Sequence, residues 1–377
     1  MVESGVDYRQ KWRERRRQVR LRRVPVAVAV LVVVAASATW MAERRLPQFG
    51  AVAWAQGDGS DGAPRIGLGG NVLVVVWEEG TVQAHDALTG RPLWRQPFSR
   101  AHELIGPPAV GADCVVFGST DCNVRCVDLK TGLERWHYAA RAIVRSTPLI
   151  VGDRVLVGAD DGRLYALSMK DGKPLWAYPA LAYADRRPIL GGAAVAGKVV
   201  VCGSCDQTAV GLELATGKPL WRRRIGSPIV ARTTAARDKV YVAAEGGEAV
   251  CLQATTGEVV WHLPVPALIR SPVLVANGCA YVADTDRGLW CLNAETGTLL
   301  WRCELPGRPT TSAVAQGGRL YVGVSRGTVE ALDASTGRLV WHWRADAKPL
   351  RELLLDAGLL YCTTNTGRVF AVRLARG

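Results

Sequence analysis

Histidine is scarce in this chain, and its residues lie far apart. The five are His85, His102, His137, His262 and His342. A metal centre built on imidazole needs several such ligands at a short spacing or on facing elements, and the sequence shows neither arrangement. We therefore expect no metal site, and we expect each histidine to lie on the surface or to pack among its neighbours.

Charge is absent from one long segment near the N-terminus. Residues 24–42, VPVAVAVLVVVAASATWMA, contain no charged side chain, while residues 9–23 hold nine Arg or Lys. A run of this length spans the hydrocarbon core of a bilayer, and a basic flank stays on the cytoplasmic side. We expect a basic cytoplasmic tail (1–23), a transmembrane helix or signal-anchor (24–42) and a linker (43–50). The remainder then lies on the periplasmic side of the inner membrane.

The competing interpretation is a cleaved signal peptide. Ala36-Ser37-Ala38 has the small-x-small pattern of a cleavage site. The apolar run continues past that site, which favours an uncleaved anchor. No cysteine lies near the end of the run, so the sequence offers no residue there for lipid attachment.

Clustered basic residues are missing from the rest of the chain. The formal net charge is +13, but residues 1–50 carry 11 basic and 4 acidic side chains, and the remaining residues carry 36 basic and 30 acidic ones. A nucleic-acid surface needs Lys and Arg gathered on one face. We expect no nucleic-acid partner, and a monomer.

What the sequence does contain is a repeat. A Thr-Gly or Asp-Gly pair is followed four residues later by tryptophan in seven places, as in LDASTGRLVW (332–341). Successive tryptophans stand 40 to 45 residues apart, which is the period of a repeat architecture. The repeat tryptophans are Trp94, Trp136, Trp176, Trp221, Trp261, Trp301 and Trp341.

Each repeat contains four short strands separated by turn residues. Residues 278–305, GCAYVADTDRGLWCLNAETGTLLWRCEL, contain three of them, and SPVLVA (271–276) is the fourth. Glycine allows the positive φ of the second turn, and a preceding Asp or Asn can bond the turn backbone. Those Asp and Asn residues are Asp86, Asp128, Asn293 and Asp333.

Four-stranded antiparallel units at this period predict an all-β fold, an eight-bladed β-propeller spanning residues 51–377. The repeat glycines, continued at the same period, predict an eighth at Gly377, and the tryptophan of that last unit would lie beyond it. Trp54, in AVAWAQ (51–56), stands forty residues before Trp94. We therefore expect residues 51–56 to supply the missing strand, which closes the ring and removes the open sheet edge.

The repeat, seen in RLYALSMKDGKPLW (163–176) and TVEALDASTGRLVW (328–341), is similar to the PQQ-like repeat with its tryptophan-docking motif. That family includes eight-bladed quinoprotein dehydrogenases and non-enzymatic propellers of the BamB type, which act in outer-membrane assembly. The resemblance covers residues 51–377. The dehydrogenases have a disulfide between adjacent cysteines, and this sequence has no Cys-Cys pair and no recognisable ligands for calcium and PQQ. We expect no cofactor and no enzyme activity.

Most of the ten cysteines occupy repeat positions that are apolar in other repeats. Cys126, Cys251 and Cys291 align with alanine or glycine, and Cys202 and Cys362 align with valine. We expect these five to be small buried residues. Cys202 and Cys205 also form a C-x-x-C pair, a weak candidate for redox or zinc chemistry. Cys122 and Cys205 fall in loops and are the better candidates for reactivity.

Arginines recur nine to eleven residues after five of the repeat tryptophans. They are Arg145, Arg187, Arg232, Arg270 and Arg351. In a propeller the innermost strand lines the channel, so these side chains are predicted to converge at one channel mouth and bind carboxylates. Each Arg could instead cap loop carbonyls or pair with a nearby acid.

The sequence thus predicts a membrane-tethered, non-catalytic scaffold that binds a protein partner, which the resemblance to BamB places in cell-envelope assembly. The mouth arginines suggest that this partner carries an acidic segment. A ligand-binding or sensor ectodomain is the alternative, and a PQQ-dependent quinoprotein is the less favoured one.

Overall fold

The computed structural model describes residues 50–57, 62–98, 103–104, 106–179, 187–346 and 348–374. The expected cytoplasmic tail, the membrane segment and nearly all of the linker lie outside these residues. Within them every regular element is a β-strand. None of the described residues forms a helix long and apolar enough to cross a membrane.

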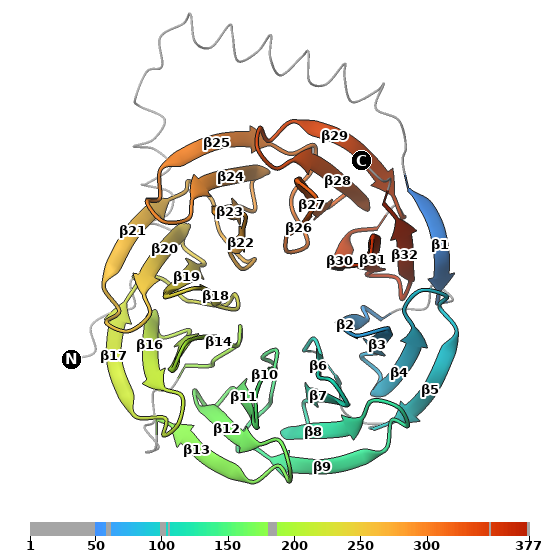
Figure 1. Cartoon of the computed structure of the whole chain (residues 1–377), viewed down its shortest axis with the longest axis vertical. Coiled ribbons are helices and arrows are strands. Elements are labelled where there is room, and N and C mark those ends of the chain that lie inside the picture. The colour runs from blue at the N-terminus through green and yellow to red at the C-terminus, as the bar shows by residue number, and fades with distance from the viewer. Residues whose placement is uncertain are drawn as a thin grey trace, which may run out of the picture. The chain divides into compact units, whose positions relative to one another are not determined.

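Eight four-stranded antiparallel sheets stand around a central channel (Figure 1). The predicted all-β, eight-bladed propeller is therefore confirmed. Blades 1 to 4 are β2 (Arg65–Gly69), β3 (Val72–Val76), β4 (Thr81–Asp86), β5 (Pro92–Pro97); β6 (Ala109–Val110), β7 (Cys114–Gly118), β8 (Asn123–Asp128), β9 (Glu134–Ala139); β10 (Leu149–Val151), β11 (Arg154–Gly158), β12 (Leu164–Ser168), β13 (Pro174–Tyr178); and β14 (Ala193–Ala196), β15 (Val199–Gly203), β16 (Thr208–Glu213), β17 (Pro219–Arg224).

Blades 5 to 8 follow the same order from the channel outwards. They are β18 (Thr234–Ala236), β19 (Lys239–Ala244), β20 (Glu248–Gln253), β21 (Val259–Pro264); β22 (Leu274–Ala276), β23 (Cys279–Ala283), β24 (Gly288–Asn293), β25 (Leu299–Glu304); β26 (Val314–Gln316), β27 (Arg319–Val324), β28 (Thr328–Asp333), β29 (Leu339–Arg344); and β30 (Leu350–Asp356), β31 (Leu359–Thr364), β32 (Val369–Arg373), β1 (Ala51–Gln56).

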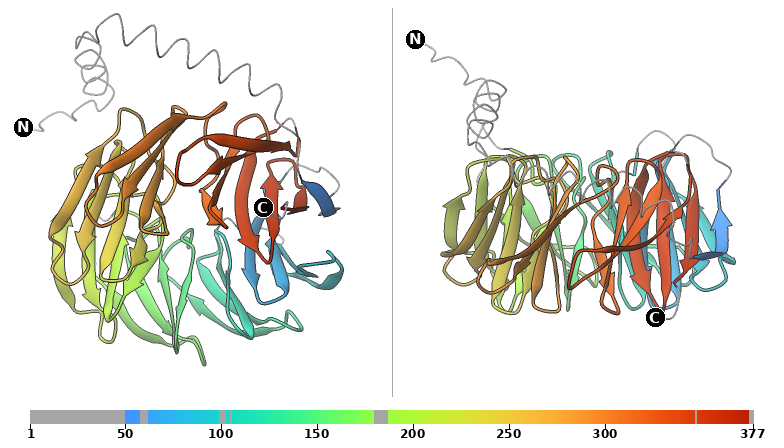
Figure 2. Two further views of the ribbon diagram at one scale, coloured as in Figure 1. Left: turned by 45° about the horizontal axis from the view of Figure 1, so that its top comes forward. Right: turned by 90° about the horizontal axis from the view of Figure 1, so that it is seen from above.

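Burial follows strand position within a blade. The two middle strands are covered on both faces by the adjacent blades, so β19 and β20 consist almost entirely of buried residues. The outer strands alternate, as in β17 with its exposed Arg222 and Arg224. The core therefore lies between blades: one cluster joins Tyr241 of blade 5 to Val282 of blade 6. Figure 2 shows the strands running between the two rims of this ring.

The turn residues bond as the sequence predicts. The Asp333 carboxylate accepts the N–H groups of Ser335 at 3.0 Å and Thr336 at 2.9 Å. The side-chain oxygen of Asn293 accepts the N–H of Thr296 at 3.0 Å. Corresponding bonds form at Asp86 and Asp128, so one turn structure recurs around the ring.

The last blade joins the two ends of the described chain. Strand β1 pairs antiparallel with β32, with Ala51 opposite Arg373 and Gln56 opposite Val369. This pairing gives β32 a partner on its outer side, where an unpaired edge would present free N–H and C=O groups.

Candidate functional site

The repeat tryptophans connect each blade to the next one. The Trp54 indole N–H donates to the Ala87 carbonyl at 2.9 Å, and the Trp221 indole donates to Ala254 at 2.8 Å. The same bond is made by Trp94, Trp136, Trp176, Trp261 and Trp301. Trp341 is buried, and no such indole bond is seen for it among the described residues; position 377, which corresponds to the repeat glycines, lies outside them.

Each of these rings lies on the repeat glycine of the following blade. A Cβ atom at Gly257 would stand 2.4 Å from the Trp221 ring, and one at Gly90 would stand 2.6 Å from Trp54. Both glycines have positive φ, 69° and 73°. Glycine therefore serves the turn and also leaves room for the indole.

The channel of the described ring contains two adjoining cavities. A cavity of about 640 Å³ is lined by the innermost strands and the segments before them, and a second of about 580 Å³ continues along the channel. Thr147 and Arg232 line both, so they lie where the two cavities meet. A space of this size accommodates a small molecule or a peptide segment.

Two predicted arginines occupy equivalent positions in their blades, six residues before the last residue of the innermost strand. We call this position the mouth level. Arg145 has this position relative to β10, and Arg270 has it relative to β22. Arg145 pairs with Asp160 at 2.7 Å and Arg270 pairs with Glu245 at 2.9 Å. Their side chains remain 44% and 64% exposed, so both guanidinium groups stay accessible to a partner.

Arg232 stands two residues closer to its innermost strand, four residues before the end of β18. We call this the inner level. Arg65 and Glu352 occupy the same position relative to β2 and β30, and their side chains form an ion pair at 3.1 Å. Glu352 also accepts the N–H of Ile66 at 2.7 Å. Arg351, beside Glu352 on β30, lines the same cavity.

We predicted that five arginines converge at the channel mouth. Arg187 departs from this prediction, because it lines neither cavity. It lies nine residues before the end of β14, where Leu190 takes the mouth-level position. The 45-residue spacing of this repeat places additional residues between Trp176 and the innermost strand. A fixed count from Trp176 therefore ends at Arg187, before the mouth-level position is reached.

Arg65 is the functional candidate that sequence reasoning missed. It follows Trp54 by eleven residues, which is within the spacing used for the other arginines. The same spacing rule predicts Arg65 once Trp54 is counted as a repeat tryptophan and blade 1 as the blade that follows it.

The cysteine predictions are confirmed at the five apolar repeat positions. Cys126, Cys251, Cys291, Cys202 and Cys362 are all buried, and burial raises the pKa of Cys202 to about 12. Cys202 lies inside β15 while Cys205 lies in the following turn, and both are free thiols. Among the described residues no group of His, Cys, Asp and Glu could hold a metal ion.

Three of the described histidines have identified side-chain neighbours. His85 is buried beside Trp54, with ring centroids 6.4 Å apart, and burial lowers its pKa. His137 contacts Glu134 at 2.8 Å and His262 contacts Glu248. These contacts are to single carboxylates and do not form a ligand set.

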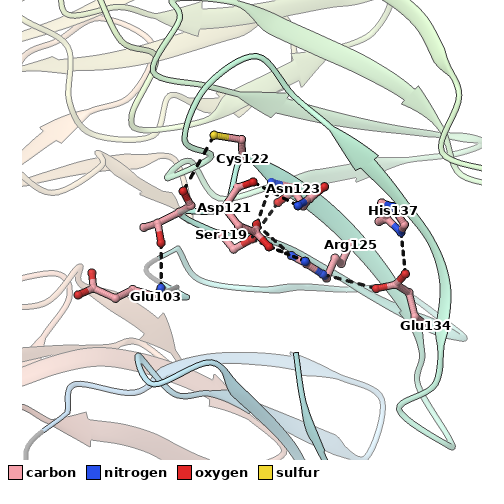
Figure 3. A network of polar contacts seen from close by, with 9 residues as sticks. Glu103, Ser119, Asp121, Cys122, Asn123, Arg125, Glu134 and His137 are labelled. Carbon is pink, nitrogen blue, oxygen red and sulfur yellow. Dashed lines mark hydrogen bonds and ion pairs between the residues drawn. The ribbon is translucent and has the colours of Figure 1, made fainter. Parts of the chain in front are cut away.

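A polar network locks the hairpin between β7 and β8 (Figure 3). Arg125 pairs with Asp121 at 2.5 Å and with Glu134 at 3.5 Å, and Ser119 also donates to Asp121. Burial acts to raise the pKa of Asp121, but hydrogen bonds from Arg125 and Ser119 outweigh it and hold the pKa well below its usual range. These groups satisfy one another, so the network stabilises the loop and is not a ligand site.

Comparison with known proteins places the ring in a described family. The family "Outer membrane protein assembly factor BamB" matches residues 78–239, 206–342 and 304–377. These overlapping matches cover well over half of the chain. No protein with a curated description matches the sequence.

Several solved structures share the fold. The BamB structure from Moraxella catarrhalis is 20% identical, with a TM-score of 0.73, and the match covers 86% of this chain and 100% of that one. The computationally designed Ika8 protein is 19% identical, with a TM-score of 0.74, and covers 85% and 98%. The quinohemoprotein alcohol dehydrogenase from Comamonas testosteroni is 12% identical, with a TM-score of 0.70, and covers 88% and 78%. At these identities the likeness concerns the fold.

Proposed function

We propose that this chain, which belongs to the family of the outer membrane protein assembly factor BamB, is a non-catalytic protein-interaction scaffold of the bacterial cell envelope. The family match along the ring is the observation that carries this proposal. A propeller suits the role, because its two rims and its channel present rigid loops around one axis.

The proposed location is the periplasmic side of the inner membrane. The charge-free run at 24–42 and the basic residues at 9–23 support a single-pass anchor with a cytoplasmic tail. Tethering would hold the ring close to the membrane and raise its effective concentration toward partners in the same envelope.

The proposed contact is the channel mouth, and the proposed partner carries an acidic segment. Arg145 and Arg270 are exposed there, and each has one carboxylate partner. An exposed ion pair contributes about 0 to 1 kcal/mol, so a partner carboxylate competes at little cost. Such binding weakens as salt screens the charges.

Site-specific photocrosslinking tests this contact in membranes. Thr310 has the mouth-level position on blade 7 and carries no charge, so a photoreactive residue placed there should crosslink the partner. The control is the same residue at Leu88, a 50% exposed position in a repeat turn. Equal crosslinking at both positions, or none at Thr310, would remove the mouth as the binding surface.

A ligand-binding ectodomain remains the second candidate, and the cavity at the inner level favours it. A dehydrogenase role is less favoured, since the chain has no adjacent cysteines of the kind that the resemblance to quinoproteins implies.

A further inference from the structure

The inner level of the channel differs from the mouth in how its charges are satisfied. At the mouth, Arg145 and Arg270 each have a carboxylate partner. At the inner level, the carboxylate of Glu352 is already held by Arg65 and by the Ile66 N–H. No acidic side chain among the described residues pairs with Arg232.

Arg351 shows the same deficit. Its Nε is buried and has no hydrogen-bond partner within the described structure. Burial lowers the pKa of Arg351 and the nearby positive charge of Arg65 lowers it further, while the carboxylates of Glu78 and Glu352 act to raise it. The Arg232 side chain is exposed within the channel, and desolvation by the surrounding walls lowers its pKa. The charge of the half-buried Arg351 is therefore more costly to keep than that of an arginine on an open surface.

The backbone beside Arg232 is built for close approach. Gly191 and Gly192 of blade 4 lie against the start of β18, and a Cβ at Gly191 would stand 2.2 Å from the Ala231 carbonyl. A Cβ at Gly192 would stand 2.7 Å from the Thr147 carbonyl and 3.7 Å from the Arg232 side chain. Gly191 thus lets blade 4 approach the backbone of the segment that carries Arg232.

Arg232 and Arg351 stand on different walls of one cavity. Arg232 comes from the segment that leads into β18, and Arg351 comes from β30, which lies three blades further round the ring (Figure 1). Both line the cavity of about 640 Å³, and Arg232 also lines the cavity of about 580 Å³ beyond it.

Three carboxylates line these cavities, and none faces Arg232 as a partner. Glu352 is held by Arg65, and Asp284 accepts the N–H groups of Asp286 and Gly288 and of the Trp290 indole. Asp356 is exposed and lines only the second cavity.

We propose that the inner level of the channel is a binding site for a small anion with carboxylate or phosphate groups, held by Arg232 and Arg351. Guanidinium binds either group through paired N–H donors. The anion supplies hydrogen-bond acceptors to the arginines within the cavity that both residues line. The inference does not depend on the protein partner at the mouth.

The same chemistry could reach the site as a free metabolite or as a side chain of an acidic segment. Titration of the purified full-length protein with succinate, with inorganic phosphate and with a short poly-glutamate peptide separates these sources. Binding of succinate or phosphate indicates a free ligand, and binding of the peptide alone indicates a segment.

Thermal unfolding with and without each probe gives the decisive comparison. Arg232→Met removes the charge and keeps an apolar stem, so its melting temperature without anion should equal or exceed that of the wild type. The same variant should lose the rise in melting temperature that the anion causes and bind it at least tenfold more weakly. Arg232→Lys should bind with intermediate strength, because it keeps the charge but loses the fork.

Arg145→Ala/Arg270→Ala is the matched control, since it removes two channel charges at the mouth only. It should retain most of the anion-induced rise in melting temperature. The proposal is overturned if no probe raises the melting temperature of the wild type, if Arg232→Met destabilises the protein without anion, or if the mouth variant loses the response as fully as Arg232→Met.

Discussion

The indole N–H of Trp54 donates a hydrogen bond to the carbonyl of Ala87 at 2.9 Å. Trp54 lies on β1, the outer strand of blade 8, and Ala87 follows β4 of blade 1. The bond therefore crosses the junction where the ring closes. It repeats the contact made at six other blade junctions, so the closing junction is built like them.

Removal of β1 should open this junction. Deletion of residues 43–58 leaves β32 without its outer partner and blade 1 without the ring of Trp54. Burial of a large aromatic side chain contributes about 2 to 3 kcal/mol, and the strand pairing adds to it. We expect a sharp fall in melting temperature, measured by circular dichroism, while deletion of residues 2–17 leaves it unchanged. An unchanged transition in the first variant would refute closure by this strand.

A methyl group at a docking glycine should destabilise the ring more than one at an ordinary turn glycine. Gly257→Ala places its Cβ 2.4 Å from the Trp221 ring, while Gly278→Ala meets nothing within 4 Å. Both positions have positive φ, 69° and 77°, so backbone strain is matched. Denaturant unfolding should show a loss of about 1 kcal/mol for Gly278→Ala and about 2 to 4 kcal/mol for Gly257→Ala. Equal losses would mean that the indole contact is unimportant.

The repeat turns should make stability depend on pH in the acid range. Hydrogen bonds from Ser335 and Thr336 lower the pKa of Asp333 to about 2, and bonds from Thr89 lower that of Asp86. A depressed carboxyl pKa stabilises the fold above the unfolded value of about 3.9, and this contribution is lost as pH falls toward the folded value.

Asn293 shows that an amide serves in the same turn without titrating. The Asp86→Asn/Asp333→Asn variant should therefore lose less stability than the wild type between about pH 4 and pH 2. Urea unfolding at several pH values checks this. Parallel stability curves for the two proteins would contradict the expected role of these turns.

The state of the N-terminus decides how the protein is held. An uncleaved anchor predicts that membrane-extracted protein retains residues 24–42 and resists extraction by salt and carbonate. N-terminal sequencing is the measurement. A mature chain that begins at Thr39 would show that Ala36-Ser37-Ala38 is a cleavage site and that the propeller is released.

The fold could be predicted because its determinants are local and periodic. A turn glycine and a tryptophan four residues later fix one blade, and seven repetitions specify the ring. The channel was harder to predict. Arg232 and Arg270 stand nine or eleven residues after a tryptophan, and this difference of two residues places them at different levels.

The partners of the arginines could not be predicted from the repeat. Asp160 lies in the hairpin of the same blade as Arg145, whereas Glu245 reaches Arg270 from the preceding blade. These pairings depend on the orientation of each hairpin relative to the neighbouring blade. The lack of an acid beside Arg232 is likewise a property of the assembled channel, because it depends on side chains from several blades.

The most direct test of the central claim is partner capture from solubilised membranes with the mouth intact or altered. The tagged wild type should enrich one or more envelope proteins at low salt. The mouth variant Arg145→Ala/Arg270→Ala should lose that enrichment while keeping its fold.

Arg91→Ala/Arg338→Ala, at exposed repeat turns, is the control for a general loss of positive charge. Quantitative mass spectrometry measures the captured proteins. The account predicts strong capture by the wild type and the control, weak capture by the mouth variant, and a decline as salt is raised. Undiminished capture by the mouth variant at low salt would contradict a scaffold that binds through its channel mouth.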